Sequence, residues 1–266
     1  RKSGVAIPSL VLVTLLALPH ALAAQAPNGK QIIERNDAMR SVDDEQVEIE
    51  MQLINKQGQK RDRRVSWVLK NDAQRNQKGL LRFLAPADVR GTALLSIENA
   101  DREDDQWLYL PALKKSRRIS ASNKSDSFVG SDFAFEDLGA EEIDQHDYRL
   151  LREDNVDGAP VYVVEATPNN DQRRKESGYS RREIFVLKDN AAIARIDFYD
   201  RQKELLKVLR SRDIRQVPST KTWRAQTIEM ANQKTGHKTV IVYGQFAINK
   251  GIGDDTFSIR ELERER

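Results

Sequence analysis

Alternation of apolar and polar side chains about a glycine turn is the feature that most restricts how this chain can fold. Residues 47–53 alternate Val, Ile, Met and Leu with Glu and Gln, the chain turns near Gly58, and Val65, Trp67 and Leu69 resume the pattern. Because successive side chains of a strand point to opposite faces, this pattern predicts an antiparallel hairpin with one buried face.

The same rhythm continues along most of the chain. Apolar-rich segments bounded by polar turns predict further strands over residues 77–86, 91–99, 105–111, 146–154, 159–168, 180–189, 191–200, 203–217, 223–233 and 237–248. Pro86 and Asp88 mark a bend or a single helical turn between two of them. The series predicts an up-and-down antiparallel sheet of roughly ten strands. A sheet that wide must curl to protect its edges.

Helical patterns are few. Residues 28–40 place Ile32, Ile33 and Met39 on one side of a helix, which predicts a short helix before the first strand. The tail from residue 253 predicts a second short helix, capped by Asp254 or Asp255. The long polar stretch 167–180 is expected to form a mobile loop or a short helix.

The first 23 residues are typical of a secretory signal. A basic start is followed by an apolar run and then by the small residues of Ala21-Leu22-Ala23, so we expect cleavage after Ala23 or nearby. A retained membrane anchor is the alternative, although Pro8 and Pro19 interrupt the run. No linker divides the remainder, so residues 24–266 are predicted to form a single domain. The predicted location is the periplasm of a Gram-negative bacterium.

Charge and cysteine content exclude several classes of function. The chain has 44 Lys and Arg against 41 Asp and Glu, a formal net charge of +3. Removal of Arg1 and Lys2 with the signal lowers it to +1, so a nucleic-acid-binding protein is not expected. The absence of cysteine excludes disulfides, thiolate metal sites and a cysteine nucleophile.

Catalytic patterns are equally sparse. Outside the predicted signal, His146 and His237 have no second ligand at metal-binding spacing, so we expect structural or surface roles for both. The chain has no G-x-S-x-G motif. Adjacent carboxylates such as Asp104-Asp105 point to opposite sides of a strand and do not face each other across a cleft. We therefore predict no enzyme activity, no cofactor and no metal, with an exported hydrolase as a weak alternative.

The stretch "QWLYLPALKKSRRIS", residues 106–120, is apolar on both faces of its predicted strand. Trp107 and Tyr109 project to one face, and Leu108 and Leu110 to the other. Two explanations stay open: a helix covers the second face as part of a packed core, or the curled sheet leaves a cavity there for an apolar ligand.

Two motifs flank the end of this strand. The run Lys114, Lys115, Arg117 and Arg118 is either a solvated hairpin tip or a contact for anionic lipid headgroups or an acidic partner. The segment "SFVGSDFAFEDL", residues 127–138, then gathers three phenylalanines around Gly130, which suits a bend or a close backbone approach.

Residues 106–120 and 127–138 together resemble the signature of the bacterial outer membrane lipoprotein-sorting protein family, a branch of the LolA/LolB-like superfamily. The shared pattern is W-x-Y-x-P, K-x-x-R and G-S-D-F-x-x-E-D-L, and it is strongest over residues 100–140. The resemblance implies a mainly β fold, a strongly curled, half-open antiparallel β-barrel with helices covering the concave side. It also implies a hydrophobic cavity for acyl chains and transport of lipids or lipid-modified proteins towards the outer membrane, without chemistry.

The resemblance also implies partners: acyl chains of a lipid or lipoprotein, an inner-membrane transporter of the resistance-nodulation-division type, and an outer-membrane acceptor. The side chains predicted to line the cavity are the large apolar ones of these strands and motifs, namely Trp67, Leu81, Phe83, Trp107, Tyr109, Phe128, Phe133 and Phe135. Lys114, Lys115, Arg117 and Arg118 are predicted to contact a partner or headgroups. The alternative function is a periplasmic sensor or scaffold. Such a protein would use the same fold to bind a protein partner and would dock through these basic residues.

Overall fold

The computed structural model describes residues 27–100 and 102–264, so the predicted signal over residues 1–23 lies outside the described part. The fold is mainly β, as expected. The strands are β1 Asp44–Ile54, β2 Lys60–Asn71, β3 Gln77–Ala85, β4 Ala93–Ile97, β5 Asp105–Leu110, β6 Lys115–Arg118, β7 His146–Val156, β8 Ala159–Pro168, β9 Tyr179–Leu187, β10 Ile193–Asp200, β11 Leu205–Gln216, β12 Trp223–Asn232, β13 Lys238–Tyr243 and β14 Ala247–Ile248.

Three α-helices accompany the strands: α1 Gly29–Arg40, α2 Asp171–Glu176 and α3 Ile259–Leu262. The helix predicted over residues 28–40 is thereby confirmed, and a short helix occupies part of 167–180. Within residues 27–100 and 102–264, none of the helices has the length and hydrophobicity to span a bilayer.

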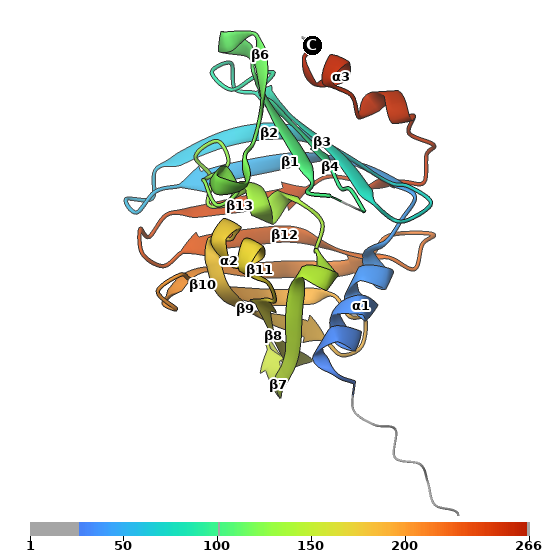
Figure 1. Cartoon of the computed structure of the whole chain (residues 1–266), viewed down its shortest axis with the longest axis vertical. Coiled ribbons are helices and arrows are strands. Elements are labelled where there is room, and N and C mark those ends of the chain that lie inside the picture. Colours follow the sequence, from blue (N-terminus) through green and yellow to red (C-terminus); the bar gives the residue numbers. More distant parts are fainter. Residues whose placement is uncertain (1–26, 101, 265–266) are drawn as a thin grey trace, which may run out of the picture.

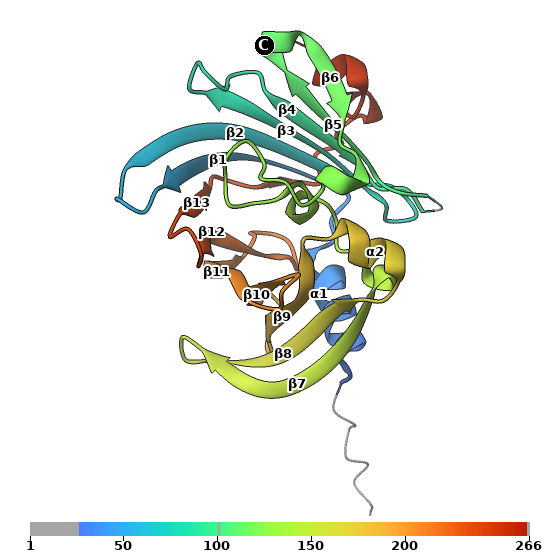
Figure 2. The same ribbon diagram turned by 60° about the vertical axis from the view of Figure 1, so that its left-hand side comes forward.

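All the strands join one antiparallel sheet in the order β6-β5-β4-β3-β2-β1-β13-β12-β11-β10-β9-β8-β7, with β14 paired to β1. The sheet curls strongly without closing, so β6 and β7 are its two edges (Figures 1 and 2). The predicted half-open barrel is confirmed. It has 14 strands instead of about ten. β6 carries no alternating pattern of its own, and β13 and β14 both fall within the single strand predicted over 237–248.

Strand register explains the composition of the concave face. Val47 lies opposite Trp67, and Trp67 opposite Leu81, so one apolar row crosses three strands. The row continues from Leu81 to Leu94 and then Leu108 on β5. Fully burying such a side chain stabilises the fold by about 1.5–3 kcal/mol. The alternation in the sequence therefore decides which residues form the main core.

Helix α1 packs inside the curl of the sheet, beside β7 and β8 (Figure 2). Its first turn is held by a capping box, in which Asn28 accepts from the Gln31 backbone and Gln31 accepts from the Asn28 backbone. Ile32 and Ile33 are buried against apolar residues of the strands, including Val164 and Ile184. The apolar side of α1 that the sequence predicts is therefore the side that packs on the sheet.

Helix α3 covers the opposite face of the sheet over β3, β4 and β5. Leu262 and Phe257 pack against apolar side chains of these strands, namely Leu80, Ala93, Leu95 and Tyr109. Arg82 is buried beside them and donates to the carbonyl oxygens of Glu261 and Leu262 at 2.5 and 3.2 Å. The guanidinium thus caps the C-terminal end of the helix.

The predicted cap of this tail helix was wrong. Ser258 is the cap, because its hydroxyl accepts from the Glu261 backbone N–H at 3.2 Å. Asp254 begins a separate 3-10 turn and forms ion pairs with Lys70 and Lys78 at 3.3 and 3.2 Å. The aspartate therefore ties the tail to β2 and β3 instead of starting the helix.

A candidate ligand-binding cavity beneath the strap

The chain crosses the open side of the sheet once. Strands β6 and β7 follow each other in the sequence but lie at opposite edges of the sheet, so residues 119–145 must span the gap between them. We call this segment the strap. Figure 1 shows it, in green, passing in front of the central strands next to α2, and it contains the G-S-D-F-x-x-E-D-L motif.

Three phenylalanine rings in mutual contact anchor the strap on the sheet. Phe128 and Phe135 of the strap and Phe83 of β3 are at most 4% exposed. The ring centroids of Phe83 and Phe128 lie 5.7 Å apart, and those of Phe128 and Phe135 lie 5.6 Å apart in an edge-to-face arrangement. Such pairs add about 0.5–1.5 kcal/mol each beyond their buried area.

A tight turn presents the residues of the motif. Val129 and Gly130 have φ of +48° and +72°, and the Phe128 N–H donates to the Phe133 carbonyl oxygen at 2.7 Å. A Cβ at Gly130 would meet no atom within 4 Å. The glycine is therefore favoured by its left-handed backbone and not by a close approach.

Asp132 fixes the strap to β13. Its Oδ2 accepts from the Thr239 hydroxyl at 2.8 Å and lies 2.7 Å from His237 Nδ1. Its backbone N–H donates to the same Thr239 oxygen at 3.0 Å. His237 thus has a structural partner, as the sequence predicted.

Asp137 holds a second, more deeply buried contact. The Lys207 ammonium donates to its Oδ2 at 2.6 Å, and the Tyr179 hydroxyl donates to its Oδ1 at 2.8 Å. The side chains of Asp137 and Lys207 are 7% and 5% exposed. Burial, together with the negative charge of Asp137, raises the pKa of Tyr179 well above its usual value, so the hydroxyl remains a donor.

The end of the strap is held by Glu141 and Arg182. The guanidinium donates to both carboxylate oxygens at 2.8 and 2.7 Å, and the Tyr148 hydroxyl donates to Oε1 at 2.5 Å. Burial raises the pKa of Glu141, but the positive charge of Arg182 outweighs it and holds that pKa at about 2. His146 lies buried beside the pair, with its Nδ1 3.0 Å from the Glu142 carbonyl oxygen.

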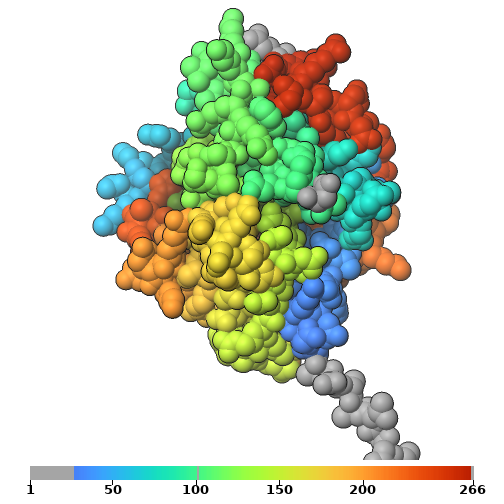
Figure 3. All heavy atoms as spheres, in the orientation of Figure 1, coloured from blue at the N-terminus to red at the C-terminus, as the bar shows by residue number. Residues whose placement is uncertain are grey.

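Between the concave face, the strap and α1 lies a cavity of about 980 Å³. This is at the upper end of the usual size of small-molecule sites. Its floor is apolar and comes from the central strands, with Ile184, Ile196, Leu209, Ile228, Met230 and Ile241. In the space-filling view of Figure 3, the strap, in green, and α2, in yellow, lie at the front of the molecule.

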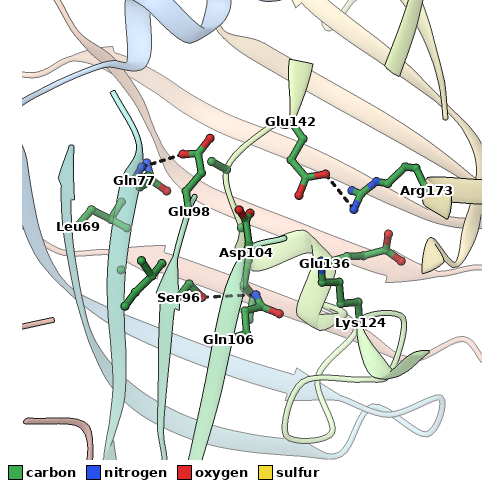
Figure 4. Close-up of a pocket in the computed structure, with 15 residues that line it drawn as sticks. Leu69, Gln77, Ser96, Glu98, Asp104, Gln106, Lys124, Glu136, Glu142 and Arg173 are labelled. Carbon is green, nitrogen blue, oxygen red and sulfur yellow. Dashed lines mark hydrogen bonds and ion pairs between the residues drawn. The ribbon is translucent and has the colours of Figure 1, made fainter. Parts of the chain in front are cut away.

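The rim of the cavity is charged and carries more acidic than basic groups. Twelve Asp and Glu residues line it against eight Lys and Arg residues. Many are paired: Arg224 donates to Glu45 Oε2 through two nitrogens at 2.9 and 2.7 Å. A recess of about 30 Å³, lined in part by Glu98, Asp104 and Gln106, adjoins the cavity on the side of β4 and β5 (Figure 4).

Of the eight side chains predicted to line a cavity, two line the one found here: Trp67 and Phe133. Four are buried in the core between strap and sheet, namely Leu81, Phe83, Phe128 and Phe135. The remaining two, Trp107 and Tyr109, lie on the opposite face in the cluster beneath α3. The covering helix thus accounts for the two apolar faces of β5.

The basic run lies at the turn and on the second strand of the β5–β6 hairpin, and its four basic side chains are exposed, as expected of a solvated hairpin. Lys114 forms a left-handed turn with φ of +46°, and the residues after it form edge strand β6. Arg118 pairs with Asp105 on the neighbouring strand at 2.7 Å, and the adjacent Leu113 is 63% exposed. Among the described residues that line the cavity, none of the four basic residues occurs.

Over residues 27–100 and 102–264, no group of three or more His, Asp or Glu side chains is placed to hold a metal ion. The adjacent Glu141 and Glu142 face separate partners, Arg182 and Arg173. These two carboxylates therefore hold the strap to α2 and β9 through their ion pairs and do not face each other across a cleft.

Sequence reasoning missed the floor of the cavity and the ion pairs of the strap. The floor residues were recognisable as the apolar positions of alternating strands, for example Ile196 and Leu209, but alternation does not say which face is concave. The partners Glu141 and Arg182 are 41 residues apart in the sequence. No local pattern signals such a pair.

Comparisons with known proteins agree with this architecture. A family model described as "uncharacterized protein" matches residues 75–264. An outer membrane lipoprotein-sorting protein domain from Vibrio parahaemolyticus is 34% identical, with a TM-score of 0.82 over 89% of this chain and 98% of that chain. A DUF1329 family protein from Desulfovibrio piger is 31% identical, with a TM-score of 0.82 over 88% of this chain and 97% of that chain.

A LolA superfamily protein from Nitrosomonas europaea shares the fold at 21% identity, with a TM-score of 0.70 over 89% of this chain and 100% of that chain. No curated protein matches significantly. The open curled sheet, the strap motif and the two relatives above 30% identity lead to one assignment. The chain belongs to the outer membrane lipoprotein-sorting protein family and has a LolA-like fold.

Proposed function

We propose that the protein is a periplasmic carrier that binds acyl chains of a lipid or lipoprotein in the cavity beneath the strap and passes them towards the outer membrane. The observation that carries the proposal is the cavity of about 980 Å³ with its apolar floor. The relative from Vibrio parahaemolyticus, described as a lipoprotein-sorting domain, supports the same class of function.

Physical chemistry makes such binding favourable without directional contacts. Each methylene that moves from water to an apolar site gains about 0.8 kcal/mol. A chain of about a dozen carbons could therefore be held tightly by the floor alone. Release then requires an acceptor that offers equal burial, such as a membrane or another carrier.

The direct test is lipid extraction and mass spectrometry of the protein purified from its own periplasm. The matched variant is Ser211→Phe, which adds a ring to a lining position of β11. The control is Arg212→Phe, which adds the same ring at the adjacent exposed position. We expect Ser211→Phe to reduce bound lipid at least about fivefold, and Arg212→Phe to leave it unchanged.

Two results would contradict the carrier. One is lipid-free protein that also fails to bind fluorescent fatty acids or fatty alcohols. The other is equal lipid loading by Ser211→Phe and the wild type in a folded protein, since the ring would then occupy space that no lipid uses.

We further propose that cargo arrives from an inner-membrane transporter of the resistance-nodulation-division type, and that the exposed edge at β6 makes the contact. Leu113 and the four basic residues Lys114, Lys115, Arg117 and Arg118 form this surface. Neutralising the four with Gln should abolish cross-linking to the transporter but leave lipid loading in vitro intact. Loss of a protein partner by a chain that never loads lipid would instead indicate a sensor or scaffold.

A further inference from the structure

The recess beside the cavity is rich in hydrogen-bond acceptors. Figure 4 shows four of the residues that line it: Glu98 and Asp104 from the turn between β4 and β5, Gln106 from β5 and Glu142 from the strap. Glu98 accepts a backbone N–H from Gln77 at 2.7 Å. These walls belong to segments far apart in the sequence that the curl of the sheet and the strap bring together.

Gln106 carries an acceptor with no donor. The side chain is 5% exposed, and its Nε2 donates to the Phe135 carbonyl oxygen at 3.0 Å. This bond fixes the orientation of the amide and leaves Oε1 buried without a partner among the described residues. A buried acceptor without a donor costs about 1–3 kcal/mol. A ligand that supplies an N–H would remove this cost.

The two cations of the recess, Lys124 and Arg173, leave part of its negative charge unpaired, and Arg173 Nε is itself buried without a hydrogen-bond partner among the described residues. Arg173 is 3.1 Å from Glu142, and Lys124 faces Glu176 at 4.0 Å. Within the described residues, Glu98 and Asp104 form no ion pair with Lys or Arg. Burial raises the pKa of Glu98, and the negative charge of Asp104 raises it further.

We propose that the recess binds a primary ammonium group at the head of an amphiphile whose alkyl chain occupies the cavity. An ammonium is a donor-only cation with three N–H groups, which matches a recess lined by an unpaired amide oxygen and by several carboxylates. The inference rests on the proposed function, because it names the headgroup of the same cargo.

Size and connection support this assignment. The recess of about 30 Å³ has room for a water-sized group such as an ammonium, which needs roughly 10–15 Å³ of such space. Leu69, Leu138 and Glu142 line both the recess and the cavity, so the two spaces adjoin. A chain on the floor can therefore place its head in the recess.

The test compares three twelve-carbon amphiphiles below their aggregation concentrations: dodecylamine, dodecanol and dodecanoate. Each displaces a neutral fluorescent alkyl probe from the protein. We expect the amine to bind about tenfold or more tighter than the alcohol, and dodecanoate to bind more weakly than the alcohol.

The double variant Glu98→Gln/Asp104→Asn should bring the amine to the affinity of the alcohol while changing the alcohol little. Glu48→Gln/Glu50→Gln, which removes the same charge from exposed positions of β1, should keep the full preference. If the double variant does not fold, the single change Asp104→Asn makes the same comparison.

Equal affinity of amine and alcohol in the wild type overturns the inference, and so does a full preference in the folded double variant. Both results leave the carrier intact, because the alcohol still binds. Failure of all three amphiphiles to displace the probe overturns the carrier and the ammonium site together.

Discussion

Glu141 shows how much one buried residue of the strap depends on its partners. Its carboxylate accepts two hydrogen bonds from Arg182 and one from Tyr148. Removing one member of a buried ion pair leaves the other charge uncompensated, which commonly costs about 3–5 kcal/mol. The end of the strap is therefore sensitive to single substitutions.

Arg182→Gln should lower the free energy of unfolding by about 3 kcal/mol at pH 7, measured by urea denaturation. The matched control is Arg181→Gln on the neighbouring outward position, where a more exposed pair with Glu183 should cost about 1 kcal/mol or less. Equal losses in the two variants would show that the buried pair has no special role.

The pH dependence of this pair has a definite sign. The pKa of Glu141 is about 2 in the folded protein against an ordinary 4.5. Between these values the unfolded chain binds more protons, so stability from this group is complete above pH 4.5 and is lost as the pH falls towards 2.

Without Arg182, burial alone should raise the pKa of Glu141 above 4.5. The loss in Arg182→Gln should then be largest at pH 7 and smaller near pH 4, where the stranded carboxylate becomes protonated. Urea titrations at both pH values measure the difference, and a constant loss would contradict this origin.

Gly29 illustrates a second residue-level constraint, a close approach of two backbones. A Cβ at Gly29 would lie 2.8 Å from the carbonyl carbon and oxygen of Tyr148. Gly29→Ala should therefore displace α1 from β7 and cost about 1–3 kcal/mol in thermal unfolding. Gly139→Ala is the control, because a Cβ there meets nothing within 4 Å, and it should change stability by about 0.5 kcal/mol or less.

At the scale of the element, side chains attach the strap to the sheet at several points. Phe128, at 0% exposed, lies at the centre of its aromatic contacts. Farther along the strap, Asp132 bonds to Thr239 of β13 and Asp137 to Lys207 of β11. Because the strap forms no sheet pairing with the central strands, these side chains determine where it lies.

Phe128→Ala should destabilise the protein by about 3–5 kcal/mol and increase hydrogen exchange in the strap more than in the central strands. Leu113→Ala removes a side chain that is 63% exposed and should have little effect on either measurement. Unchanged exchange in the strap of the folded Phe128→Ala protein would contradict its role as the anchor.

The elements differ in how far the sequence could predict them. β1 and β2 were recognisable because alternation has a period of two, which only a strand satisfies. β6 was not, since "KSRR" has no apolar alternation and pairs only because β5 lies beside it. Trp107 and Tyr109 revealed an apolar face but not which layer covers it, because α3 comes from residues about 150 positions later.

The contacts of the strap were unpredictable for a related reason. The motif placed Phe133 and Asp137 in one short segment, but Thr239, Lys207 and Arg182 come from strands whose order in space depends on the pairing of the whole sheet. The resemblance to a family carried the information about a cavity, whereas composition and spacing could not distinguish it from a solid core.

At the scale of the whole molecule, the open sheet and its strap enclose a cavity of limited size, about 980 Å³. The edges β6 and β7 remain apart, residues 119–145 connect them, and helix α1 packs inside the curl beside β7 and β8. The cavity therefore exists because the sheet is curled and unclosed, and its length is limited by the strands that form the floor.

A limited depth predicts how affinity depends on chain length. In a series of primary alcohols from octanol to tetradecanol, each methylene should tighten binding about fourfold, equivalent to about 0.8 kcal/mol, until the floor is full. Beyond that length the affinity should level off. Displacement of a fluorescent alkyl probe measures the slope, and thermal shifts at saturating alcohol provide an independent readout, because a ligand of the folded state raises its stability.

The variant Ser211→Phe, which places a ring in the cavity, makes this prediction specific to the cavity. Ser211→Phe shortens the available floor, so its affinities should level off at a shorter chain than those of the wild type, while Arg212→Phe should follow the wild type. An identical series in all three proteins would mean that the alcohols bind elsewhere, for example at exposed Leu113. A slope that never levels off would likewise contradict a cavity of limited length, because only a chain on an open surface can keep burying methylenes without limit.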